Sequence, residues 1–178
     1  MTRSERAESR GTGIRLGVSA CLLGEPVRYD GGHKRDRYIT DLLAQWFEFV
    51  PVCPETGIGM PTPRPPIRLV RTSRGVRALE VDDPDRDVTD RLEGYYELVA
   101  PRLAGISGYI LKAKSPSCGM ERVKLYGEEG ELLVEKSRGR FAERLLAAQP
   151  LLPVEEEGRL NDPVLRENFI TRVFVHRR

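Results

Sequence analysis

Three cysteines carry the most specific chemical signal in this sequence of 178 residues. Cys21, Cys53 and Cys118 each follow a short apolar run and stand in a turn of small residues, proline or glycine. Cysteines that only pack as small hydrophobes have no reason to share that setting. We therefore expect the three thiols to meet at the carboxyl edge of a sheet, where open α/β proteins build their sites.

The spacing of these cysteines narrows the chemistry that they can do. No C-x-x-C pair occurs, which excludes the usual structural zinc knuckle and the thioredoxin-type dithiol. Three thiolates leave one coordination position of a metal open, as a catalytic site requires, and soft sulfur ligands favour zinc or an iron–sulfur cluster. His33 is a candidate fourth ligand, although a lone histidine in a charged loop is more commonly solvated. The alternative is that all three cysteines are ordinary buried residues.

Polar residues with acid–base chemistry stand beside two of the cysteines. Glu55 comes two residues after Cys53, on the same side of an expected extended segment, and a carboxylate there can act as a general base. Ser115 and Ser117 flank Cys118 and can donate hydrogen bonds to a substrate oxygen or ring nitrogen. The alternatives are a capping or solvated glutamate and serines that serve only the turn.

Cations are concentrated near the same segments. Residues 21–36 form a long loop rich in glycine and charge, and a loop of that length in a compact domain is usually functional or mobile. Arg28 and Lys34 in this loop, with Arg64 beyond it, are candidates to bind a substrate phosphate. The alternative is that these charges only face solvent.

The intervening segments predict an α/β protein. We expect a single Rossmann-like domain over residues 14–178, with a mainly parallel central sheet flanked by helices, behind a disordered leader of residues 1–13. The expected strands are residues 14–19, 47–52 and 108–113, with a last strand or extended segment over residues 151–157. The expected helices are 38–46, 87–103, 140–148 and a last one opened by Asp162 and Pro163. Hairpins are expected at 67–81 and after 123–126, and a stiff proline-rich connector at 60–66.

Composition excludes several other classes of protein. The net charge of +2 argues against nonspecific phosphate contacts as the main activity. No apolar run is long enough to cross a membrane, and residues 1–13 lack the apolar centre of a signal peptide. An odd number of widely spaced cysteines suits the reducing cytoplasm.

Four motifs, in order along the chain, resemble those of the thiouracil desulfidase family. They are SACLLG (19–24) with RYDG (28–31), CPE (53–55) with TPRPP (62–66), KSPSCG (114–119), and EEEGRL (155–160). The resemblance runs from about residue 14 to residue 175, and residues 1–12 lie outside it.

This resemblance implies a [4Fe–4S] cluster held by only three cysteines, Cys21, Cys53 and Cys118. It also implies non-redox removal of sulfur, as hydrosulfide, from a thiolated uracil base or nucleotide. Its catalytic residues fall on Glu55, which would activate water, and Ser115, which would move a proton. No redox partner is then required.

Some members of the family carry a second, C-terminal domain and act on thiolated RNA. This sequence stops at Arg178, so a small thiolated base or nucleotide is favoured over tRNA. Two rival functions stay open: a zinc-dependent hydrolase of a small nucleobase-like substrate, and a non-catalytic iron–sulfur sensor or electron carrier.

Overall fold

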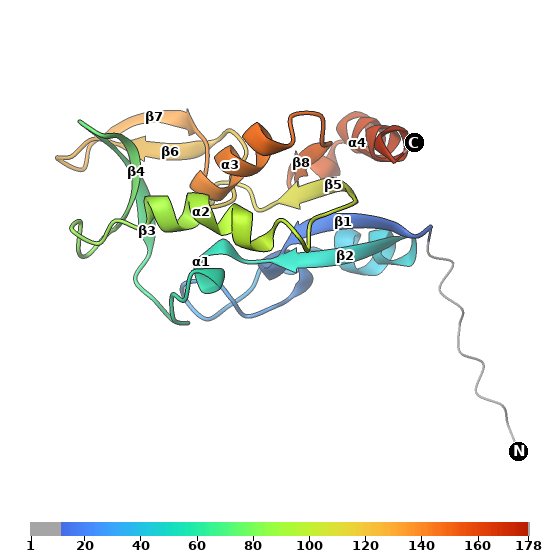
Figure 1. Cartoon of the computed structure of the whole chain (residues 1–178), viewed down its shortest axis with the longest axis horizontal. Coiled ribbons are helices and arrows are strands. Elements are labelled where there is room, and N and C mark those ends of the chain that lie inside the picture. Colours follow the sequence, from blue (N-terminus) through green and yellow to red (C-terminus); the bar gives the residue numbers. More distant parts are fainter. Residues whose placement is uncertain (1–11, 178) are drawn as a thin grey trace, which may run out of the picture.

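The computed structural model describes residues 12–177, which form two four-stranded sheets arranged along the long axis of the molecule (Figure 1). Sheet A has the order β2-β1-β5-β8, and all of its neighbouring strands are parallel. Its strands are β1 (Ile14–Ser19), β2 (Phe47–Val52), β5 (Ile106–Leu111) and β8 (Val154–Glu156). The predicted parallel sheet is therefore confirmed for these four strands.

Sheet B is a separate and mixed sheet in the order β4-β3-β6-β7. Two antiparallel hairpins, β3–β4 and β6–β7, join through a parallel pairing of β3 with β6. Its strands are β3 (Ile67–Thr72), β4 (Gly75–Glu80), β6 (Val123–Tyr126) and β7 (Leu132–Ser137). Both predicted hairpins are present, but the structure does not confirm a Rossmann-like fold. A proline-rich connector cannot supply ladder hydrogen bonds, and residues 60–66 lead the chain away from sheet A.

Helices cover both faces of sheet A. On one face α2 (Thr89–Val99) and α3 (Arg140–Ala148) enclose a core that includes Tyr109 and Phe141. On the other face α4 (Pro163–His176) buries Phe169 and Val173. The Asp162 carboxylate caps α4, since its Oδ1 accepts hydrogen bonds from the next two free amides at 2.8 and 3.2 Å, as the sequence predicted.

The helix predicted at residues 38–46 is wrong as a regular α-helix. A π-helical turn, η2 (Tyr38–Leu42), is followed by a 3₁₀ turn, η3 (Leu43–Gln45). Both Ile39 and Leu43 are buried, so two short turns satisfy the apolar spacing that suggested a helix. The chain then enters β2 directly.

The predicted leader falls outside the described residues as far as residue 11. Thr12 belongs to the folded part, because its amide donates to the Trp46 carbonyl at 3.2 Å. The predicted boundary between the leader and the domain at residue 14 stays a prediction. No helix within residues 12–177 has the length and apolar character needed to span a membrane.

The centre of sheet A depends on a close approach between two strands. Tyr109 of β5 pairs in register with Gly17 of β1, and all six residues of β5 are buried. A Cβ atom added at Gly17 would lie 2.3 Å from the Tyr109 ring. Glycine in the interior of a strand usually marks such a contact, and here it lets the ring cross β1.

We expect Gly17→Ala to lower the free energy of unfolding by about 1–3 kcal/mol, because the added methyl overpacks the core. Gly94 in α2 is the matched control, since nothing lies within 4 Å of a Cβ added there. Gly94→Ala should raise stability by up to about 1 kcal/mol through helix propensity. Urea denaturation measures both, and equal effects of the two changes would contradict the close approach.

Candidate functional site

The carboxyl ends of the sheet A strands meet at one edge and form the floor of a cavity of about 320 Å³. The chain leaves β1 toward Cys21, β2 toward Cys53, and β5 toward the loop of Cys118. Strand β1 lies between β2 and β5, which is the kind of switch point where open sheets bind ligands. Apart from His33, the candidate site residues of the sequence analysis all line this cavity: Cys21, Arg28, Lys34, Cys53, Glu55, Arg64, Ser115, Ser117 and Cys118.

All three cysteines are free thiols, and two are buried. Burial raises the pKa of the Cys21 thiol to about 11, and the nearby charges of Lys112 and Cys53 lower and raise that pKa, respectively. Burial also raises the pKa of Cys118 well above its usual range, and the charge of Cys53 raises it further. A charge on Cys53 thus raises the pKa of both other thiols. A bound metal would favour their thiolate forms.

The arrangement of the thiols is compatible with a cluster. Among the residues that the structure describes, no three histidine, cysteine or carboxylate side chains are close enough together to hold one metal ion. The thiols nevertheless line one shared cavity. An iron–sulfur cluster takes its cysteine ligands on separate iron atoms, so the three sulfurs need not converge on one point.

The loop after β5 is shaped by the serine at its start. The Ser115 Oγ accepts hydrogen bonds from the amides of Ser117, at 3.2 Å, and Cys118, at 3.0 Å, while Gly119 donates to the Ser115 carbonyl at 2.8 Å. A hydroxyl that accepts in this way still has its own proton to donate. Ser115 therefore both orders the cysteine turn and presents a donor to the cavity.

Glu55 does not lie on an extended segment, as the sequence analysis expected, but in the short helix α1 (Pro54–Gly57). Cys53 is the N-cap, and Pro54 at the first helical position favours this early helical turn. The Glu55 Oε1 accepts a hydrogen bond from the Ser117 hydroxyl at 2.7 Å, and the Oε2 accepts one from the Arg64 Nε at 2.7 Å. Each carboxylate oxygen keeps a further lone pair for a ligand.

Arg64 lines the cavity but makes its hydrogen bonds to the protein. Its side chain is only 2% exposed. Besides Glu55, its guanidinium donates to the Val27 carbonyl at 2.7 Å and to the Pro61 carbonyl and Thr62 hydroxyl, each at 3.2 Å. The side chain holds Glu55 in place and ties two loops to it. The substrate contact predicted for Arg64 stays a prediction.

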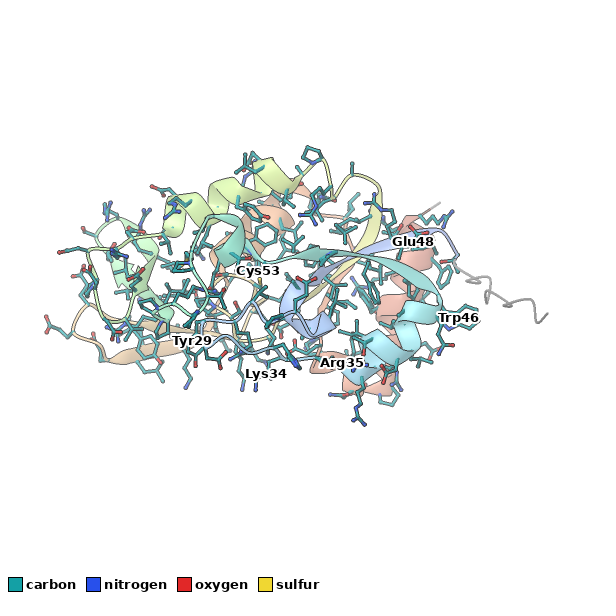
Figure 2. All side chains as sticks on the ribbon, turned by 90° about the horizontal axis from the view of Figure 1, so that it is seen from below. Tyr29, Lys34, Arg35, Trp46, Glu48 and Cys53 are labelled. Carbon is teal, nitrogen blue, oxygen red and sulfur yellow. The ribbon has the colours of Figure 1, made fainter. Side chains whose placement is uncertain are left out.

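Two cationic residues of the loop at residues 24–37, Arg28 and Lys34, line the cavity. The Lys34 amide donates to the Cys21 carbonyl at 2.9 Å, and the Arg64 amide donates to the Tyr29 carbonyl at 2.8 Å, so the loop is fixed at two points. The Arg28 guanidinium lies 5.6 Å from the centre of the Tyr29 ring. Figure 2 shows Tyr29, Lys34 and Cys53 toward the middle of the molecule, with Trp46 and Glu48 at one end. His33, the candidate fourth ligand, is not among the cavity-lining residues.

Sequence reasoning gave no role to the glutamates that follow Pro153. The Glu157 carboxylate accepts hydrogen bonds from the Lys112 ammonium at 2.5 Å and from the Ala113 amide at 2.7 Å. The Glu156 carboxylate accepts one from the Met120 amide at 2.7 Å. These contacts brace the loop of Cys118 at both ends. The available signals were three consecutive glutamates after a short apolar run and their place in the EEEGRL motif (155–160).

Comparison with known proteins agrees with this geometry. Residues 16–157 match the family model described as 2-thiouracil desulfurase. No curated protein matches the chain. A solved structure described as a [4Fe-4S]-dependent thiouracil desulfidase, TudS, is 32% identical, with a TM-score of 0.64. The match covers 89% of this chain and 99% of that one.

The buried ion pair makes Arg64 a stability determinant. Arg64→Met should cost about 3–5 kcal/mol of unfolding free energy, because it leaves the Glu55 carboxylate without its buried partner. Arg28→Met is the matched control at the same cavity. Within residues 12–177 Arg28 forms just one ion pair, a long one of 3.7 Å with the exposed Asp30, so its loss should cost less than about 1 kcal/mol. Similar midpoints for both variants in chemical denaturation would contradict the anchoring role.

Proposed function

This chain belongs to the 2-thiouracil desulfurase family, and on that premise we propose that it hydrolyses the carbon–sulfur double bond of a thiolated uracil. The products are the oxo base and hydrosulfide. The observation that carries the proposal is the meeting of three cysteines, a braced glutamate and a free serine hydroxyl at one cavity.

In the proposed enzyme Cys21, Cys53 and Cys118 hold a [4Fe–4S] cluster. When bound, the cluster supplies an iron without a protein ligand, a Lewis acid for the soft thiocarbonyl sulfur. The raised pKa values of Cys21 and Cys118 make cluster loading a step that releases protons. The free thiols of all three ligands suit a reducing cytoplasm.

Glu55 acts in this proposal as the general base. Its carboxylate takes a proton from a water molecule as the water oxygen attacks the carbon that carries sulfur. Ser117 and Arg64 each hold one carboxylate oxygen, so the free lone pairs are already oriented before substrate binds. The Ser115 hydroxyl lends its proton to the substrate ring and regains it as the carbon–sulfur bond breaks and sulfur leaves as hydrosulfide. Water supplies every atom that the product gains, so no electrons are transferred and no redox partner is required.

The mouth of the cavity favours an anionic form of the substrate. Arg28 and Lys34 from one loop and Lys114 from another line it, and the one carboxylate among the lining residues, Glu55, is paired with Arg64. A cavity of about 320 Å³ accommodates a base, with a phosphate at the cationic mouth. We therefore take a thiouridine mononucleotide, rather than tRNA, as the substrate, bound through Arg28, Lys34 and Ser117.

The two rival functions explain less of the site. A zinc hydrolase needs its three ligands on one ion, and no such group occurs within residues 12–177. A sensor or electron carrier has no use for the Glu55–Ser117–Arg64 network. Neither rival accounts for the family match.

Replacement of the proposed base tests the reaction. Anaerobically reconstituted wild-type protein should be brown and should convert 4-thiouridine monophosphate to uridine monophosphate with release of sulfide. Glu55→Gln should lower the turnover number by at least about 10²-fold while iron and sulfide contents stay unchanged. Glu48→Gln, on the exposed part of β2, serves as the control. Loss of the cluster in Glu55→Gln would make Glu55 a structural residue, and a colourless wild-type protein inert toward thiolated uracils would refute the function.

The proposed phosphate contact predicts a difference between two substrates. The double change Arg28→Gln and Lys34→Gln should raise KM for 4-thiouridine monophosphate about tenfold, because charged hydrogen bonds to phosphate are lost. The same change should leave KM for the uncharged base, 4-thiouracil, nearly unaltered. Arg35→Gln is the control in the same loop, because Arg35 pairs with Asp41 outside the cavity. An equal rise for base and nucleotide would place the phosphate elsewhere.

A further inference from the structure

Tyr109 is a buried phenol whose hydroxyl has no hydrogen-bond partner within residues 12–177. The side chain is fully buried, and no group in the described part of the chain pairs with its hydroxyl. Leaving a buried hydroxyl unpaired is unfavourable, whereas phenylalanine would fill the same space without that penalty. The hydroxyl therefore indicates a partner that comes from outside the polypeptide.

The position of the ring places this phenol beneath the candidate site. Tyr109 lies in β5, crosses β1 at Gly17, and packs on Phe141 of α3 with ring centres 6.3 Å apart. It belongs to the same buried cluster as Cys118 and Val52, the residue just before Cys53. The phenol thus lies on the face of sheet A that two of the three cysteines approach.

The charges that act on the phenol also indicate that it lies near the cysteines. Burial is the main cause of the raised pKa of Tyr109, and the charges that raise it further are those of Cys118, then Tyr95, then Cys53. Tyr95 lines the other side of this region, where its ring packs against Gly57 of α1. Of these three neighbours, Cys118 and Cys53 are proposed ligands of the cluster. The sulfur atoms of a bound cluster can accept a hydrogen bond.

We propose that Tyr109 donates a hydrogen bond to a sulfur atom of the iron–sulfur cluster held by Cys53 and Cys118. This inference rests on the proposed function, because it requires the cluster. A donor to a cluster or cysteine sulfur withdraws negative charge, which stabilises the bound cluster and raises its reduction potential. Tyr109 is in this view a positioning residue for the cluster and does not touch substrate.

Tyr109→Phe tests the inference, because it removes only the hydroxyl. In the cluster-free protein the unfolding temperature should stay the same or rise, since an unpaired buried group is lost. In the reconstituted protein the cluster should be lost to a chelator roughly two- to tenfold faster. The midpoint potential of the cluster, measured by dye-mediated titration, should shift to a more negative value.

Tyr96→Phe is the matched control in the same core. The Tyr96 hydroxyl accepts a hydrogen bond from the Gln149 amide at 2.9 Å, so its partner belongs to the protein. Tyr96→Phe should lower the unfolding temperature equally with and without the cluster. It should leave the rate of cluster loss and the midpoint potential unchanged.

Each remaining outcome overturns the inference. A Tyr109→Phe protein with the wild-type rate of cluster loss and the wild-type potential shows that no such hydrogen bond exists. Destabilisation of the cluster-free protein to the same degree as by Tyr96→Phe shows that the phenol has a partner without the cluster. A wild-type protein that takes up no cluster refutes the proposed function and this inference together, and iron analysis distinguishes that failure from the other two.

Discussion

Strand β5 is the constraint on which the rest of the structure depends. All six of its residues are buried, and it pairs with β1 on one side and β8 on the other, always in parallel. A strand buried on both faces is mostly apolar, and parallel pairing places all carboxyl ends at one edge. The loops that carry the cysteines therefore start from the same edge of the sheet, although up to 97 residues separate them in the sequence.

Carboxylates stabilise the polar loops at that edge of sheet A by accepting hydrogen bonds from them. The Arg64 guanidinium donates hydrogen bonds to both the Glu55 carboxylate and the Val27 carbonyl. The Glu157 carboxylate accepts hydrogen bonds from the Lys112 ammonium and the Ala113 amide. Buried charges persist only where partners satisfy them. The same hydrogen bonds that make the loops stable also orient the groups proposed to do the chemistry.

Sheet B contributes to the site through its first strand. The proline-rich connector leads from α1 to β3, and the start of β3 at Ile67 reaches the wall of the cavity. Arg64 lies in this connector, so one stiff segment both separates the two sheets and supplies the buried partner of Glu55. The stiffness of the connector and the position of the base are thus linked.

The sequence by itself determined the parts of this protein that depend on local patterns. Apolar runs identified the strands of sheet A, the Asp162–Pro163 pair identified the start of α4, and the cysteine turns identified the edge at which the cavity lies. The residue types at those turns and in the charged segments near them also selected nine of the residues that line it. These signals are local, because hydrophobic period and turn chemistry act within a few residues.

Only the tertiary structure decided how those parts are combined. Pairing of β3 with β6 made sheet B a separate sheet, a choice that depends on residues more than 50 positions apart. Packing buried Arg64 beside Glu55, and within residues 12–177 it left the Tyr109 hydroxyl without a hydrogen-bond partner. The physical reason is that pairing, burial and hydrogen-bond partners are set by distant segments, which no local pattern encodes.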